Sequence, residues 1–424
     1  MQKNCLTALA DGRQDAALHG FTSVTCAFWA ILKDFAALSR EAMRVLHLIS
    51  SGGMYGAENV VGALARDLEE LGCWVRVGIF QNEHCPPNSV ADQLEKRGVR
   101  LTRIVCRGRW DRAASRQIRD IIRSEQIQLV HSHGYKSNLY GYMASRGMEV
   151  PRVATCHLWT RQTAAIRIYE FIDAMLLRRF DAVVAVSGVI AQDLRCMGIS
   201  EGKISTIDNG IDLAPFASAQ PALAQEIAKG DRLLIGTAGR MVAQKGMDYF
   251  LRAAREVLNE APQTMFAIVG DGPDRQKLEG LAQELKISEQ VIFTGSRTDM
   301  PQVYASFDVF VLASIDEGMP MAILEALASS RAVVATQVGA VPKLIVAGQT
   351  GMLVPPTDVR ALADAILVLV RNPDLRARLG RGGSALVQKQ FSSRVMSEQY
   401  LRLYEGLLSP EGLNSNSTSL TGKV

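Results

Sequence analysis

Short apolar segments alternate with helical patterns along most of this chain, and this alternation restricts the possible folds more than any other feature. From Met43 onward, strands are predicted at RVLHLIS, WVRVGIF, LTRIV, LVHSH, PRVATCH and DAVVAVS, with helical periodicity between them. These strands are almost continuously apolar and rich in β-branched residues. A parallel sheet with helices on both faces is therefore expected.

The alternation starts again after a stretch rich in proline and alanine near residue 216. Strands are predicted at RLLIGTAG, MFAIVGD, VIFTG, VFVLAS, AVVAT and GMLVP, and the pattern ends near residue 390. We therefore expect an α/β protein with two doubly wound, Rossmann-like domains, at 43–215 and 216–390, which face a central cleft. A helix at 391–408 is expected to pack back towards the first domain, and the polar tail 409–424 to be disordered.

Residues 1–42 fit neither domain and are interpreted as an extension or an upstream start. Lys33 and Asp34 interrupt the most apolar run, which is shorter than the roughly 20 residues that span a bilayer. An amphipathic helix is therefore favoured over a membrane segment. Since no membrane helix is predicted elsewhere, we expect a cytoplasmic protein, at most peripheral at the inner face of the membrane.

Composition and residue spacing exclude several kinds of site. A net charge of +4 over 424 residues, without nucleic-acid-binding motifs, excludes nucleic acid as a partner. The seven cysteines lack the spacing of zinc sites and fit a reducing compartment. His131 and His133 end one predicted strand and His157 ends another, but no carboxylate stands at ligand spacing. No metal site is expected, and a structural role is favoured for any single histidine.

The segment GRMVAQKG, which follows a predicted strand, contains a candidate phosphate site. Gly239 permits a sharp turn, and Arg240 and Lys245 flank the loop that leads into the next helix. Two cations beside a helix amino end form a good cradle for a diphosphate. Solvated surface cations are the alternative interpretation.

The segment DEGMPMAILEA places two glutamates around a strand-to-helix turn. Gly318 permits close approach of a ligand to the backbone, and Pro320 suits the first helical turn, whose free N–H groups can bind an anion or hydroxyls. Glu317 is suited to bind sugar hydroxyls or to stabilise positive charge, and Glu325 to bind a vicinal diol such as ribose. A salt-bridged helix residue is the alternative for Glu325, although an unpaired buried carboxylate is costly.

Two features of the first half suggest further contacts. Gly52 and Gly53, in SSGGMYGAE, form a close-approach loop, or a plain turn; the dinucleotide-binding spacing is absent. Arginines are dense at 100–123, and Arg178 and Arg179 end a second basic segment. These segments form either a solvated surface or a contact with an anionic membrane or a lipid-linked acceptor.

Together these segments resemble glycosyltransferase family 4, retaining enzymes of the GT-B fold, from Met43 to about residue 405. The resemblance implies a metal-independent enzyme that needs no cofactor beyond its donor substrate, a UDP- or GDP-linked sugar, held mainly by the second domain. The segments that carry it are SSGGMYGAE, HSHGYKSN, ATCH, AVSGVIAQDLRCMGI, KISTIDNGID, GTAGRMVAQKG, IVGDGP, VIFTG, EGMPMAILE, GAVPKLI and GQTGMLVPP.

The resemblance also implies roles for individual residues, of which Glu317 and His157 would be catalytic. The other implied roles are Arg240 and Lys245 at the donor diphosphate, Glu325 at the ribose, the backbone of Gly318, Met319 and Pro320 at the sugar, and Gly52 and Gly53 at phosphate and acceptor. The chain departs from the family pattern in GAVPKLI, where Lys343 stands at a usually acidic position. That departure leaves one loop beside the donor site unassigned.

The expected function is transfer of a sugar, with retained configuration, from a nucleotide sugar to a carbohydrate or lipid-linked acceptor in cell-surface polysaccharide biosynthesis. Two alternatives stay open at this point. One is a sugar-nucleotide epimerase on a GT-B-like fold, which would need no acceptor. The other is a non-catalytic protein that binds a sugar nucleotide without turnover.

Overall fold

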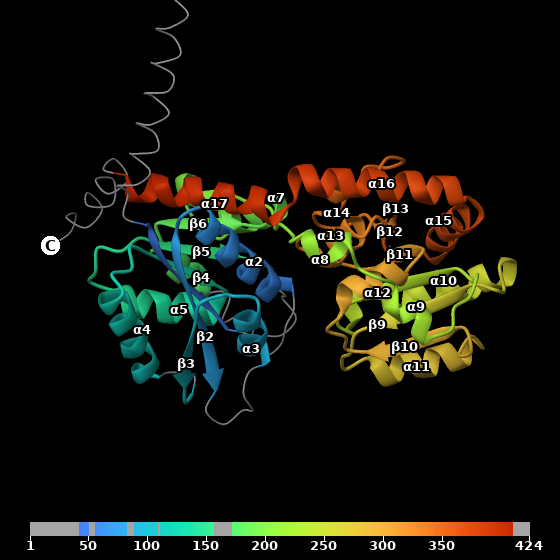
Figure 1. The fold of residues 1–424 in the computed structure, drawn as a ribbon, viewed down its shortest axis with the longest axis horizontal. Helices are drawn as coiled ribbons and strands as arrows, with labels where there is room; N and C mark the ends of the chain where they lie inside the picture. Colours follow the sequence, from blue (N-terminus) through green and yellow to red (C-terminus); the bar gives the residue numbers. More distant parts are fainter. Residues whose placement is uncertain (1–41, 51–55, 83–88, 109–110, 157–171, 410–424) are drawn as a thin grey trace, which may run out of the picture. The chain divides into compact units, whose positions relative to one another are not determined.

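The computed structural model describes residues 42–50, 56–82, 89–108, 111–156 and 172–409. Within them, the residues from Arg44 on form one compact unit that contains two parallel sheets (Figure 1). No helix of the described part is both long and apolar enough to span a membrane.

The first sheet has seven described strands in the order β3-β2-β1-β4-β5-β6-β7, and every pair is parallel. Six of these strands coincide with the predicted ones, and the parallel arrangement is confirmed. The edge strand β7 was not predicted, because it has only three residues and none of them is buried. The strands are β1 (Arg44–Ile49), β2 (Trp74–Asn82), β3 (Leu101–Cys106), β4 (Leu129–His133), β5 (Arg152–Cys156), β6 (Ala182–Ala185) and β7 (Ile204–Thr206).

Helices connect these strands and bury one face each. In α4, for example, the Asp111 side chain accepts hydrogen bonds from two N–H groups of the first turn, and Ala114, Ile118 and Ile122 lie in the core. The basic segment that ends with Arg178 and Arg179 falls partly outside the described residues, and its residues 172–177 are helical. The helices are α2 (Gly56–Glu70), α3 (Ser89–Lys96), α4 (Arg112–Ser124), α5 (Tyr135–Ser145) and α7 (Gly188–Cys196).

The second sheet has six described strands in the order β10-β9-β8-β11-β12-β13, again all parallel. All six coincide with predicted strands, and β8, β9, β11 and β12 are completely buried. The strands are β8 (Leu234–Ala238), β9 (Met265–Val269), β10 (Val291–Gly295), β11 (Val309–Leu312), β12 (Ala332–Thr336) and β13 (Met352–Val354).

Helices of the second half cover this sheet and then lead back to the first. The last one, α17, places Tyr404 and Tyr400 against the first sheet, where their hydroxyls bond His131 and Thr155 at 2.6 and 2.9 Å. The helices are α8 (Ala214–Ala217), α9 (Ala222–Glu226), α10 (Met247–Glu260), α11 (Arg275–Glu284), α12 (Met300–Ser306), α13 (Met321–Ala328), α14 (Val341–Leu344), α15 (Val359–Arg371), α16 (Pro373–Gln390) and α17 (Ser393–Leu408).

The segment that leaves β7, residues 207–212, is called the linker below. It runs beside the junction of α16 and α17: the Ile211 N–H donates to the Phe391 carbonyl, and the Ser393 N–H donates to the Ile211 carbonyl, both at 2.8 Å. A Cβ on Gly210 would lie 2.6 Å from the Ser392 carbonyl oxygen, so the close approach requires glycine here. The two segments are thus held together by backbone bonds.

Candidate functional site

The candidate donor residues lie where the second sheet reverses its strand order. In that sheet β8 lies between β9 and β11, so the chain winds outward in opposite directions from β8 and β11. Loops at the carboxyl ends of such strands form the usual ligand site of doubly wound sheets. Arg240 and Lys245 follow β8, and Glu317 follows β11.

The loop after β8 is packed tightly against the loop after β9. The Met241 N–H donates to the Asp271 carbonyl at 2.9 Å, and a Cβ on Gly270 would lie 2.0 Å from the Gly239 carbonyl oxygen. Arg240 extends from this supported loop and is exposed. Among the described residues no side chain pairs with its guanidinium, so it is available to a ligand.

Lys245 and Glu317 are brought together by the fold, although the sequence predicted separate roles for them. The Lys245 ammonium donates to a Glu317 carboxylate oxygen at 2.6 Å, and the Ser314 hydroxyl donates to the same oxygen at 2.7 Å. The Glu317 side chain is only 6% exposed, whereas Lys245 is half-buried. A buried carboxylate is thus compensated by one cation and one hydroxyl.

The residues Glu317–Pro320, called the EGMP turn, are buried and supported by backbone contacts. The Ala340 N–H donates to the Gly318 carbonyl at 3.1 Å, and a Cβ on Gly339 would lie 1.8 Å from the Glu317 carbonyl oxygen. Gly339 has a φ of +50°, which also favours glycine. These contacts hold the backbone of the EGMP turn in one conformation.

Pro320 corrects one detail of the sequence analysis. It is the cap residue of α13 in extended conformation, not a member of the first helical turn, and the helix begins at Met321. At this position the missing N–H of proline costs no helical hydrogen bond, and its fixed φ fits the extended backbone that precedes the helix. In the described part of the chain no side chain caps α13, which leaves its first N–H groups for a ligand.

Glu325 lies one turn into α13 and is half-buried. Burial raises the pKa of its carboxyl to about 7, and the nearby Tyr304 hydroxyl opposes this rise. The Tyr304 hydroxyl is itself buried and has no partner of normal hydrogen-bond geometry among the described residues. In the described part of the chain no cation pairs with Glu325, so the salt-bridged alternative is not observed there; a carboxyl group without a cation is compatible with a diol-binding role.

The candidate site residues of the first half belong to the glycine loop after β1 and to the chain directly after the strand β5. Gly52, Gly53 and His157 lie outside the described residues. The first sheet reverses its order between β1 and β4, so the strand that leads to the glycine loop borders the reversal point.

His131 and His133 are buried together with a third histidine, His47. The sequence analysis did not single out His47. His47 is in register with His131 on the neighbouring strand, and its Nδ1 lies 3.1 Å from His133 Nε2. Burial lowers the pKa of His47 to about 3. Both His131 nitrogens are hydrogen-bonded, to Tyr404 and to Thr155 at 2.6 and 2.7 Å.

This histidine cluster resembles a metal site only in its spacing. The three ligand atoms lie within 4.8 Å of one another. However, a divalent ion would have to displace the hydrogen bonds of His131, and burial of its charge is costly without a carboxylate. The contacts favour a structural network, and the expected lack of a metal stays a prediction.

A second buried polar pair of the first half was also missed by the sequence analysis. The Asn138 side-chain N–H donates to the Asp173 carboxylate at 2.8 Å, and burial raises the pKa of Asp173 to about 6. Both residues stand in unremarkable helical sequence, so no signal marks them. Burial thus also shifts the pKa of a carboxyl group in the first half.

The arginine-rich segments serve two different purposes. Arg119 donates to the Ala144 carbonyl at 2.9 Å, and Arg178 donates to the Met197 carbonyl at 2.6 Å, so both cap helix ends. Arg112, Arg116 and Arg123 of α4 are exposed instead. Only part of the basic surface is therefore free for a partner.

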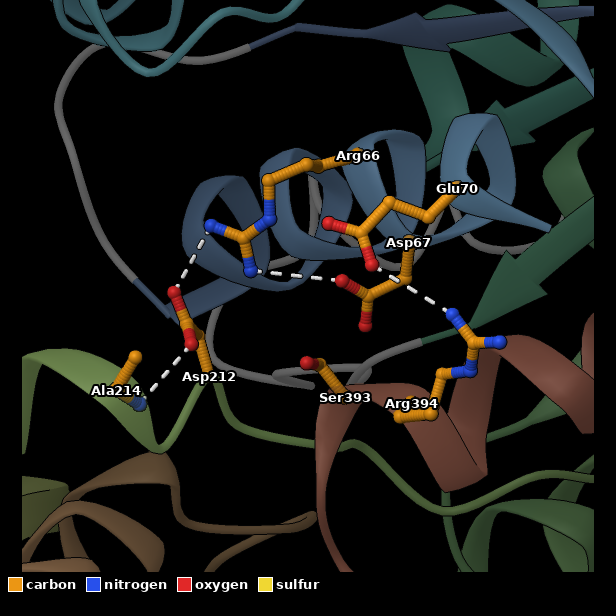
Figure 2. A pocket seen from close by; sticks show the side chains of 7 residues that line it. All are labelled: Arg66, Asp67, Glu70, Asp212, Ala214, Ser393 and Arg394. Atoms are coloured by element: carbon orange, nitrogen blue, oxygen red, sulfur yellow. Dashed lines mark hydrogen bonds and ion pairs between the residues drawn. The ribbon is translucent and has the colours of Figure 1, made fainter. Parts of the chain in front are cut away.

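Figure 2 shows a pocket that is separate from the candidate donor residues. It has a volume of about 460 Å³ and lies between α2, the end of the linker and the start of α17. Ion pairs cross it, from Arg66 to Asp212 at 2.9 Å and from Arg394 to Glu70 at 3.5 Å. The first pair ties the linker to α2, and the second ties α17 to α2.

Two family descriptions match the chain, one in each half. Residues 54–215 match Glycosyltransferase Family 4, and residues 232–372 match Glycosyl transferases group 1. The lipopolysaccharide core biosynthesis mannosyltransferase LpcC of Rhizobium leguminosarum is 32% identical over 255 residues, which are 58% of this chain and 70% of LpcC. The alpha-maltose-1-phosphate synthase of Mycolicibacterium smegmatis is 28% identical over 311 residues, 66% of this chain and 79% of the synthase.

A solved structure extends this similarity to the whole fold. HepE of Anabaena, in complex with UDP and glucose, aligns with a TM-score of 0.76 at 21% identity and covers 86% of this chain and 100% of HepE. The two parallel sheets thus form a GT-B fold, as predicted. With its two matching halves and its similarity to LpcC, this chain belongs to glycosyltransferase family 4.

Proposed function

We propose that this glycosyltransferase moves a sugar from a UDP- or GDP-linked donor to a carbohydrate or lipid-linked acceptor, with retained configuration, in surface polysaccharide biosynthesis. The observation that carries the proposal is the Lys245–Glu317 pair. Lys245 shares the loop after β8 with the exposed Arg240, and Glu317 precedes the start of α13, which no side chain caps in the described structure. HepE, which has the same fold, was solved with UDP and glucose, and LpcC is named a mannosyltransferase.

In this proposal the cations hold the donor diphosphate. Arg240 is exposed, Lys245 is half-buried, and both stand in the segment after β8, so both can reach a diphosphate bound at this loop. They stabilise the negative charge that develops as the diphosphate leaves, and this is the role that makes a metal unnecessary. The leaving phosphate then accepts the proton of the acceptor hydroxyl on the same face of the sugar.

The carboxylates have complementary tasks. Glu317 with the backbone of Gly318 and Met319 binds the sugar and stabilises positive charge on its ring, and Glu325 binds the ribose hydroxyls. The distance along the chain supports this division, because the EGMP turn and one helical turn separate the two carboxylates. In the first half, His157 and the loop of Gly52 and Gly53 would serve the acceptor side.

We also propose domain boundaries and a cellular location that fit a glycosyltransferase with this donor site. The boundaries proposed are 43–215 for the acceptor domain and 216–390 for the donor domain, with 391–408 as a returning helix. A cytoplasmic enzyme at the inner face of the membrane would reach a lipid-linked acceptor through the exposed arginines of α4.

A two-stage experiment tests the function. Purified protein is first screened by thermal shift against UDP- and GDP-linked sugars, since a ligand at 100 times its dissociation constant adds about 2.7 kcal/mol of stability. Donors that bind are then incubated with and without candidate acceptors. Stabilisation by none of them would refute the proposal. Isomerised donor without acceptor would indicate an epimerase, and binding without any turnover would indicate a non-catalytic protein.

A further inference from the structure

Lys343, the residue that departs from the family pattern, contacts the linker. Its ammonium pairs with one carboxylate oxygen of Asp208. Lys343 is 51% exposed, but Asp208 is half-buried, and its other oxygen is buried without a hydrogen-bond partner among the described residues. An exposed ion pair alone contributes little, whereas a partly buried carboxylate that loses its cation is destabilised.

The linker also contacts the EGMP turn directly. The N–H of Asn209, the residue after Asp208, donates to the Met319 sulfur at 3.2 Å, and both residues are buried. Met319 is one of the residues whose backbone is assigned to the sugar. A shift of the linker at Asp208 would therefore displace a neighbour of the donor.

The helix that carries Lys343 provides a second connection to the same turn. α14 has four residues, and among those described no side chain caps it, so tertiary contacts must determine its position. Val341 and Leu344 bury one face of the helix in the hydrophobic core. Just before the helix, Gly339 and Ala340 contact the backbone of the EGMP turn. The ion pair of Lys343 with Asp208 adds a contact to the linker.

The linker is itself held in place by contacts with other helices. Beyond Asp208 and Asn209, Ile211 is bonded to the junction of α16 and α17, and Asp212 is paired with Arg66. The linker is thus fixed at the far side, and Asp208 can hold α14 against it.

We propose that Lys343 and Asp208 form a positioning pair that holds the EGMP turn in the geometry that binds the donor sugar. Neither side chain is assigned to a reacting atom; they act through α14, Gly339 and Met319. The inference rests on the proposed function, because it names residues that determine how well the nucleotide sugar is bound.

Charge reversal provides the kinetic test. Lys343→Glu and Asp208→Lys each place like charges together, and the double variant restores an opposite pair with reversed sign. Each single variant should raise the donor KM by roughly three- to tenfold, and the double variant should return it to within about twofold of the wild-type value. Lys343→Arg should behave like the wild type. Lys277→Glu, at an exposed lysine of α11, is the matched control for the charge change.

Hydrogen–deuterium exchange of the free protein gives a readout that needs no substrate. Lys343→Glu should speed exchange at the amides of Gly318 and Met319, and the double variant should slow it again. A purely structural role would lower the melting temperature of the single variants but change neither this exchange nor the donor KM. That result would overturn the inference, and so would a double variant that restores neither quantity.

The two proposals can fail separately. If the wild-type protein binds no nucleotide sugar, the proposed function is wrong, and the exchange experiment still decides whether Lys343 positions the turn. If the wild type turns over a donor and Lys343→Glu has the wild-type KM and exchange rates, the function stands and the positioning pair is refuted.

Discussion

The ammonium of Lys245 lies 2.6 Å from the carboxylate of Glu317, a residue 72 positions further along the chain. The two loops that carry them leave β8 and β11, the neighbouring strands at which the second sheet reverses its order. Before a donor arrives, the candidate phosphate-binding lysine thus compensates the candidate sugar-binding glutamate. A bound diphosphate would compete with Glu317 for this cation.

This pairing separates the effects expected for the two cations. Arg240→Ala should lower kcat/KM by about 100- to 1000-fold, the loss typical of one preorganised charge-stabilising donor, and should leave stability unchanged because Arg240 is exposed. Lys245→Ala should lose activity and also about 1–3 kcal/mol of unfolding free energy, because Glu317 stays buried without its cation. Steady-state kinetics and urea denaturation measure both. Undiminished turnover of Arg240→Ala would rule out its role.

Donor binding should depend on the protonation of Glu325. Its pKa is about 7 in the free protein, and ribose hydroxyls donate to the ionised form. Donor affinity should therefore fall below pH 7, by up to about tenfold per pH unit. Isothermal titration calorimetry from pH 5.5 to 8 measures how donor affinity changes with pH. Glu325→Gln should bind weakly at every pH, and an unchanged slope in this variant would exclude Glu325 as the titrating group.

The Glu325 carboxyl should also make the free energy of unfolding depend on pH, with the opposite sign: donor affinity falls at low pH, whereas stability falls at high pH. Its pKa in the folded protein, about 7, is above the ordinary 4.5, so the folded state binds the extra proton between these values. The contribution of this group to stability is then greatest at low pH and is lost as pH rises towards 7 and above. Glu325→Gln should be more stable than the wild type at pH 8 and similar to it at pH 4.5, as denaturation curves would show.

The buried histidine cluster should make the protein sensitive to acid. The pKa of His47 is about 3 in the folded protein and about 6.5 in the unfolded chain, so the unfolded state binds the proton first as pH falls. Stability should decline below pH 6.5 by at most about 1.4 kcal/mol per pH unit from this group. His47→Asn should reduce that slope in urea denaturation at pH 7.5, 6.5 and 5.5. Equal slopes would mean that other groups dominate.

Gly339 should tolerate no side chain. Gly339→Ala combines a positive φ with a Cβ placed 1.8 Å from the Glu317 carbonyl oxygen. Gly348→Ala is the matched control, with a φ of +73° and no atom within 4 Å of the added Cβ. The control should cost about 1 kcal/mol for its conformation, and Gly339→Ala more, with a higher donor KM. Equal melting temperatures for the two variants would contradict the tight packing of the EGMP turn.

The proposed membrane contact predicts that binding to anionic lipid depends on the exposed arginines of α4. Reversing the charge of Arg112, Arg116 and Arg123 should abolish flotation with anionic liposomes at low salt, because each basic residue contributes about 1 kcal/mol near such a surface. Arg119 and Arg178 are left unchanged, since both cap helices.

A control variant makes that result interpretable. Charge reversal of Arg378, Arg381 and Lys389, all exposed on α16, changes the net charge equally. If both triple variants float like the wild type, α4 is not the attachment surface. If both lose flotation, net charge rather than the α4 surface decides binding.

The periodicity of the sequence was sufficient for most of the fold. Buried parallel strands such as β11 and β12 are continuous apolar runs, and local sequence alone identifies them. The short edge strand β7 escaped, because pairing with β6 rather than its own composition makes it a strand. The family was likewise readable, because its motifs are short contiguous segments in a characteristic order.

What the sequence could not reveal is which side chains meet. Periodicity placed Lys245 and Glu317 on two loops, but only the adjacency of β8 and β11 makes them a pair. The partner of Lys343 is 135 residues away, in a linker whose course depends on its bonds to the α16–α17 junction. Sequence patterns determine local conformation through the side chains of neighbouring residues, whereas these contacts between distant residues exist only after the strands and helices have packed into the tertiary structure.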